Sequence, residues 1–162
     1  MVPMTLHNLE AVREECRAMV NKRAIVSGAA SLVPVPGMDI AADVGMLMEL
    51  LPAISRKFGL AKEQIDDYDY QMKMFIFNLI RSAGTEFAGR VITKELIIAA
   101  MKRIGLRITA KQIAKYIPII GQACAVSVSI AAMRYVGNSH VDDCHAIAKQ
   151  IVGTRALRAD WQ

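Results

Sequence analysis

The chain has 162 residues, 54% of them hydrophobic but only 6% aromatic, with a formal net charge of +5. This length corresponds to one domain or two very small ones, and the surplus of aliphatic residues and methionine suits closely packed helices better than aromatic-rich strands. Three cysteines without C-x-x-C spacing argue against a redox motif and fit free thiols in a reducing cytosol. The first stretch, MVPMTLHNLEAVREEC, has no apolar core, so we expect a cytoplasmic protein without a secretory signal.

Apolar residues recur at helical spacing along almost the whole chain, and no segment shows the sustained alternation of a strand. The sequence therefore predicts an all-α protein: a single compact bundle of about seven to eight helices, forming one domain over residues 1–152, and a C-terminal tail over residues 153–162. Prolines, glycines and capping residues set the expected helix ends. The predicted helices cover, in chain order, residues 6–20, 22–32, 36–57, 62–81, 86–104, a short stretch between 109 and 118, 121–136 and 139–152.

Two stretches share an unusual form: SLVPVPGMDIAADV begins at residue 31 and KYIPIIGQACAVSV begins at residue 115. Each has apolar residues, a proline, a glycine soon afterwards and then a small-residue apolar segment. Because proline ends a helix and glycine permits a tight turn, both stretches predict an apolar helix–Pro/Gly–helix hairpin. The residues expected to define these corners are Pro34, Pro36, Gly37, Asp39, Asp43, Pro118 and Gly121.

The two aspartates of the first corner lie one helical turn apart, which could place paired carboxylates in a catalytic or cation-binding site. Asp39 falls in the first turn of a predicted helix, where the exposed N–H groups favour a negative charge. Asp43 lies deeper among apolar residues, so we expect it to reach a basic side chain or the end of another helix. A structural role is favoured for both.

Residues 116–133 carry no charge and could just span a bilayer by their number. They include Pro118 and Gly121, however, which leave a helix of about 15 residues and roughly 22 Å, short of the ~30 Å hydrocarbon core. A buried hairpin is the preferred interpretation. Peripheral association and conditional insertion remain open.

Basic residues are concentrated between residues 81 and 115, a segment that contains eight lysines and arginines but only two glutamates. Such a region can attract anionic lipid or an acidic partner, whereas the alternative is an ordinary solvated helix face. Nucleic acid is not the expected partner. The candidate lipid- or partner-binding residues are Arg90, Lys94, Lys102, Arg103, Arg107, Lys111 and Lys115.

Candidate chemistry is limited to the segment SHVDDCH, in which His140, Cys144 and His145 are weak candidates for a metal site or a Cys–His pair. Cys144 also falls on the apolar stripe of its helix, which favours a buried structural cysteine. The segment GTEFAGRV, from residue 84, has the glycines of a phosphate-binding loop but lacks its lysine and hydroxyl residue. We therefore expect no catalytic residues, no cofactor and no small-molecule substrate.

The segment LVPVPGMDIAADVGMLMELLPAISRKFGL, over residues 32–60, resembles the C-terminal helical region of the immunity-related GTPases. The segment YIPIIGQACAVSVSIAAMRYVGNSHVDDC, from residue 116, resembles the helical domain of YcjF-like bacterial proteins. The chain has none of the P-loop and base-recognition motifs of a G domain. The resemblance implies a helical region that is not catalytic, and that packs against a GTPase, self-assembles or associates with membranes.

Together these features predict a non-enzymatic helical binding protein, associated with a membrane surface or a GTPase, that acts through protein or anionic-lipid contacts. The expected partners are a protein, either a GTPase or a second copy of this chain, and an anionic membrane surface. One alternative is a conditionally membrane-inserting, pore-type effector or the inhibitor of one. The other is a metal- or thiol-dependent enzyme centred on His140, Cys144 and His145.

Overall fold

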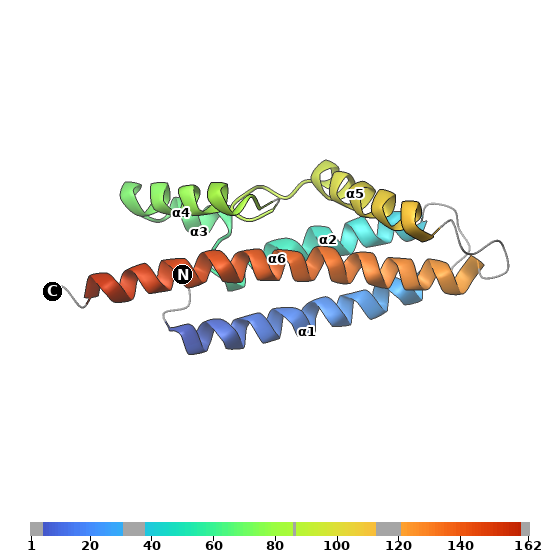
Figure 1. Ribbon diagram of the computed structural model, residues 1–162, viewed down its shortest axis with the longest axis horizontal. Coiled ribbons are helices and arrows are strands. Elements are labelled where there is room, and N and C mark those ends of the chain that lie inside the picture. The colour runs from blue at the N-terminus through green and yellow to red at the C-terminus, as the bar shows by residue number, and fades with distance from the viewer. Residues whose placement is uncertain (1–4, 31–37, 86, 113–120, 160–162) are drawn as a thin grey trace. The chain divides into compact units, whose positions relative to one another are not determined.

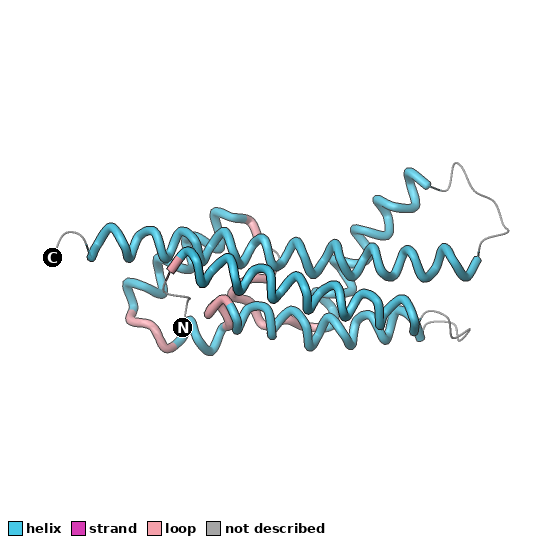
Figure 2. Tube along the Cα trace, turned by 90° about the horizontal axis from the view of Figure 1, so that it is seen from below, coloured by secondary structure: helices cyan, strands magenta, loops and turns pink. Residues whose placement is uncertain are grey.

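All regular secondary structure in the described part of the protein is helical. A computed structural model of the chain describes residues 5–30, 38–85, 87–112 and 121–159, and within these ranges it contains helices and connecting turns but no strand (Figures 1 and 2). The all-α prediction is therefore confirmed, with six helices in the described ranges in place of the predicted seven to eight. The helices are α1 (Leu6–Ala30), α2 (Met38–Lys57), α3 (Lys62–Asp66), α4 (Tyr70–Ala83), α5 (Lys94–Gln112) and α6 (Gly121–Ala159).

Contacts between residues divide the chain into two units. Unit 1 comprises residues 1–18, 51–91 and 138–162, and unit 2 comprises residues 19–50 and 92–137. The helices α1, α2 and α6 contribute one part to each unit, whereas α3 and α4 belong to unit 1 and α5 to unit 2. Each unit has its own apolar core, as the alternation of buried and exposed residues along the helices requires.

Unit 1 is built on the first part of α1 and the last part of α6, which run in opposite directions (Figure 1). Its buried side chains come from these two helices, from the end of α2 and from the segment that follows it. They are Leu9 and Cys16 of α1, Leu51 and Ile54 of α2, Phe58 and Leu60 after it, Ile65 of α3, Ile76 of α4, and Val141, Cys144, Ile147, Ala148 and Ile151 of α6.

Unit 2 has a smaller described core. The second part of α1, the first part of α2, the described part of α5 and the first part of α6 each supply apolar side chains. They are Val20 and Ala24, Val44, Leu47 and Leu50, Ile97 and Ala100, and Ala132, Met133 and Val136.

Two predicted breaks are absent, because α1 and α6 are each continuous. The predicted break between residues 20 and 22 contains neither proline nor glycine, and the buried stripe of α1 continues through Ala24 and Ser27. The break predicted at Gly137 is also wrong. A Cβ atom at position 137 would lie 2.7 Å from Val20 Cγ1, so glycine here permits two helices to approach closely inside unit 2. The predicted tail is helical as far as Ala159.

Two other predicted helices differ at their ends. The predicted helix over 62–81 is divided into α3 and α4, because the Asp69 side chain accepts a hydrogen bond from the Met72 backbone N–H at 2.9 Å and starts a new helix. The predicted helix over 86–104 begins only at Lys94, after a turn with positive φ at Gly84 and Gly89. It continues through the predicted stop at residue 105 to Gln112.

The prolines of both predicted corners lie outside the described residues, which omit 31–37 and 113–120. The helix α2 begins at Met38, within the first corner, and α6 begins at Gly121, within the second. Among the described residues, no helix has both the length and the apolar character that crossing a bilayer requires.

Candidate binding surface

The helix α5 presents three of the seven predicted basic residues on one side and buries the other side. Ile97 and Ala100 are buried in unit 2, whereas Lys94, Ile98 and Lys102 are exposed. The exposed three are spaced i, i+4 and i+8, and therefore lie in one stripe along the helix. Arg103 is exposed beside this stripe. We refer to Lys94, Ile98, Lys102 and Arg103 as the α5 face.

The start of α5 accounts for Glu95, the acidic residue in the first turn of this helix. The Thr93 hydroxyl accepts a hydrogen bond from the Leu96 backbone N–H at 3.3 Å, as an N-cap does. Hydrogen bonds from the backbone N–H of Glu95 itself and from Thr93 hold the pKa of the Glu95 carboxyl below its usual range. Negative charge is favoured at this end of a helix. Glu95 is thus explained by the helix terminus, and three cations dominate the exposed side.

The other predicted basic residues are not part of this face as described. Arg90 is exposed in the turn before α5, where its backbone N–H donates to the Phe87 carbonyl at 3.2 Å. Arg107 and Lys111 lie in α5, but the structure does not describe their side chains. Lys115 lies outside the described residues.

Of the predicted corner residues, only Asp43 has a described side chain. Pro34, Pro36, Gly37 and Pro118 lie outside the described residues. Asp39 is in the first turn of α2, with its side chain not described, and Gly121 is the first residue of α6.

Asp43 is buried in unit 2 between two serines that the sequence analysis did not single out. The Ser27 hydroxyl donates to Oδ1 of Asp43, and the Ser129 hydroxyl donates to Oδ2 at 2.5 Å. The two hydroxyl oxygens are 2.9 Å apart. The expectation of a basic side chain or a helix end was wrong, because two hydroxyl donors from α1 and α6 satisfy both carboxylate oxygens.

His140 and Cys144 lie in the core of unit 1 without access to solvent. His140 Nε2 is 2.9 Å from the Ser55 hydroxyl and 3.2 Å from the Leu51 carbonyl oxygen. The carbonyl can only accept, so Nε2 carries the proton in this arrangement. Phe87 packs its ring edgewise on the imidazole, at 5.7 Å between centroids.

Burial favours the neutral forms of the ionisable groups in this core. It lowers the pKa of His140 to about 4, against the smaller opposing effect of the Leu51 carbonyl. It raises the pKa of the Cys144 thiol, and it raises the pKa of Cys16 to about 11. Neutral thiols are poor nucleophiles and poor metal ligands. Among the described side chains, no three histidines, cysteines or carboxylates are grouped closely enough to hold a metal ion.

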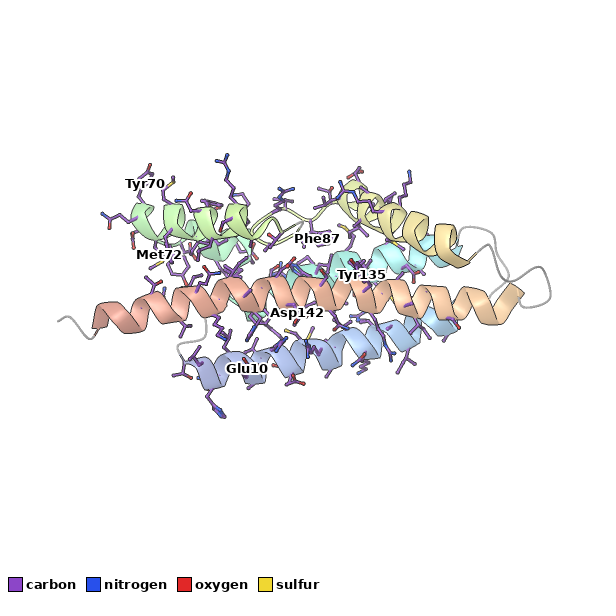
Figure 3. The ribbon with its side chains drawn as sticks, viewed as in Figure 1. Glu10, Tyr70, Met72, Phe87, Tyr135 and Asp142 are labelled. Carbon is purple, nitrogen blue, oxygen red and sulfur yellow. The ribbon has the colours of Figure 1, made fainter. Side chains whose placement is uncertain are left out.

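His145, the third candidate, joins two helices of unit 1 instead. Its Nε2 is 2.9 Å from Glu10 Oε1 of α1. One helical turn earlier on α6, Asp142 Oδ1 accepts hydrogen bonds from Arg13 at 2.8 Å and from Arg17 at 3.0 Å. Figure 3 shows Glu10 and Asp142 between α1 and α6. The sequence offered no signal for these pairs, because their partners are more than 120 residues apart.

A second exposed surface, on α4 in unit 1, was also missed. Tyr70, Met74 and Phe77 are exposed although they are large and apolar. In Figure 3, Tyr70 points away from α6 whereas Met72 points toward it. The i, i+4, i+7 spacing of the three residues is visible in the sequence, but the sequence analysis did not single it out.

Comparison of the chain with protein-family models, curated proteins and solved structures found no match.

Proposed function

We propose that this protein is a non-enzymatic helical binding protein that associates with anionic membrane surfaces through the α5 face. One observation carries the proposal: Lys94, Ile98 and Lys102 form an exposed stripe on a helix whose opposite side, at Ile97 and Ala100, is anchored in the core of unit 2. A helix held in this way offers its cations to a flat surface without having to unfold.

The residue types fit a lipid headgroup region. Each lysine or arginine near an anionic bilayer contributes about 1 kcal/mol, and the long apolar stems of lysine allow the ammonium groups to reach the phosphates while the helix lies in the interface. Ile98, which is 36% exposed between the two lysines, can enter the boundary between headgroups and acyl chains. An apolar residue at the centre of a cationic stripe is less suited to a purely phosphate surface such as nucleic acid.

The family resemblance supports the same role. In the immunity-related GTPases and the YcjF-like proteins the helical region is not catalytic, and membrane association is among its functions. An acidic protein, including the GTPase that the resemblance implies, is the competing occupant of the α5 face.

Vesicle flotation tests the proposal. The full chain should float with phosphatidylcholine vesicles that contain phosphatidylserine and remain unbound with phosphatidylcholine alone. Binding should weaken with added salt, because exposed charges are screened over about 8 Å at physiological ionic strength. The variant K94Q/K102Q should bind roughly 30-fold more weakly, since two contributions of about 1 kcal/mol are lost.

A matched variant separates the α5 face from net charge. K22Q/K149Q removes two other exposed lysines and gives the same net charge. It should retain nearly full binding. Equal weakening of both variants would show that overall charge, not the α5 face, drives association. Failure of the full chain to bind anionic vesicles at low salt would reject the membrane role and leave an acidic protein as the occupant.

A further inference from the structure

The exposed side of α4 is a continuous stripe of four residues. Tyr70, Met74 and Phe77 are 77%, 43% and 41% exposed, and Arg81 is exposed one turn further on. Their spacing of i, i+4, i+7 and i+11 places all four within a narrow arc of the helix. Ile76, on another side of α4, is buried in unit 1. Three large apolar side chains in one line on a surface helix indicate a contact with another molecule.

The charges along α4 differ between its two ends. Asp67 and Asp69 are exposed at the start of the helix, and Asp69 uses Oδ1 to cap Met72. Arg81 is exposed in the last turn. The start of α4 is thus flanked by two carboxylates and the half-buried Lys73, whereas Arg81 gives its last turn a positive charge.

We propose that α4 pairs antiparallel with α4 of a second copy of this chain. Positions 70 and 81, and likewise 74 and 77, are equally distant from the midpoint of the stripe. A two-fold axis at that midpoint places Met74 against Phe77 of the second copy, and Tyr70 against Arg81. A self-complementary patch of this kind is what a two-fold dimer requires.

The ends of the pair add polar contacts to the apolar centre. Each Arg81 reaches the start of the opposite helix, where the Tyr70 ring can take a cation on its face and Asp67 and Asp69 supply negative charge. The opposed helix dipoles also favour the antiparallel direction. A parallel arrangement would instead bring like charges together at both ends.

The same charges disfavour a bilayer as the occupant of α4. Asp67 and Asp69 lie beside the apolar stripe and would be repelled by an anionic lipid surface. The stripe is only about 16 Å long, at 1.5 Å per residue, so the interface is small and the dimer should be weak and concentration-dependent. This inference does not depend on the lipid proposal, because α5 contributes no residue to it.

Sedimentation velocity over a wide concentration range tests the dimer. The full chain should change from one-chain to two-chain mass as concentration rises. M74E or F77E should raise the dissociation constant about a hundredfold or more, because the substitution enters a two-fold interface twice. I25E, which places the same charge at an exposed apolar position on α1, should leave the dimer intact.

Disulfide trapping tests the antiparallel direction, in a C124S background in which the two other cysteines are buried. An oxidised mixture of Y70C and R81C should give a mixed dimer, because these positions face each other across the pair. Y70C alone should not, because its two copies would lie about 16 Å apart.

Three results would overturn the inference. They are a chain that is monomeric at every concentration, dimerisation of M74E and F77E as strong as that of I25E, and cross-linking of Y70C alone as efficient as that of the mixture. A monomeric chain that loses vesicle flotation in M74E would assign α4 to lipid instead.

Discussion

Asp43 shows how strongly a buried carboxylate depends on individual side chains. Each of its oxygens accepts a hydrogen bond from a different buried serine, and these serines come from α1 and α6. A carboxyl group in a core is tolerated only when its oxygens have hydrogen-bond partners. The sequence showed that Asp43 would be buried, but the identity of its donors depended on helices that are distant in the chain.

We predict that S129A lowers the free energy of unfolding by about 2 kcal/mol, because it removes a buried hydrogen bond and leaves a buried oxygen of Asp43 unsatisfied. D43N should be milder, since an amide can both accept from one serine and donate to the other. Urea unfolding measures both. S139A, at an exposed position of the same helix, is the control. An equal loss in S139A would contradict the role assigned to the Asp43 cluster.

At the scale of helices, Gly137 shows that a glycine can fit a helix to its neighbour instead of ending it. The sequence predicted a stop there from the Gly–Asn pair, a pattern typical of helix ends. In the structure α6 continues, and the missing side chain makes room for Val20 of α1. A glycine that ends a helix and a glycine that lets a neighbouring helix come close can have the same local sequence. Only the neighbouring helix distinguishes them.

We predict that G137A destabilises the protein by about 1–3 kcal/mol, because the new methyl group would lie 2.7 Å from a Val20 side chain that is stiff at χ1. G153A is the matched control in the same helix, since nothing lies within 4 Å of its added Cβ. It should stabilise by up to about 1 kcal/mol through helix propensity. Thermal or urea unfolding distinguishes the two signs, and V20A should partly rescue G137A. Stabilisation by G137A would contradict the close approach.

The starts of α4 and α5 are set by local side chains, although the helices predicted over 62–81 and 86–104 missed both. Asp69 and Thr93 each bond to the backbone N–H three residues later, and such contacts fit within one short segment. The continuous courses of α1 and α6 could not be predicted in this way, because packing against other helices maintains them.

At the scale of the whole molecule, buried His140 makes stability depend on pH. Its pKa is about 4 in the folded protein and 6.5 when exposed. Between these values the unfolded chain binds a proton that the folded protein does not, so stability rises with pH. We predict a loss of about 3 kcal/mol as pH falls from 6.5 to 4.

Urea unfolding as a function of pH measures this loss. H140Q should flatten the dependence in that interval, whereas H7Q, at an exposed position, should retain it. If H140Q is too unstable, the imidazole resonance of His140 in the native protein provides the test: titration near pH 6.5 would contradict the prediction. Below about pH 4 a further loss should follow. Burial opposes the ionisation of Asp142, but Arg13 and Arg17 outweigh it and hold the pKa of its carboxyl below 3.8.

The sequence by itself determined the helical class, the burial of Cys144 and the cationic character of the α5 face. These properties follow from apolar periodicity and residue charge, which are local quantities. Only the tertiary structure decided that Asp43 bonds to two serines, that Gly137 lies inside a helix and that the apolar stripe of α4 is exposed. Each of these depends on which surface another part of the chain covers. The spacing of residues within one segment does not reveal its contacts with residues far away in the sequence.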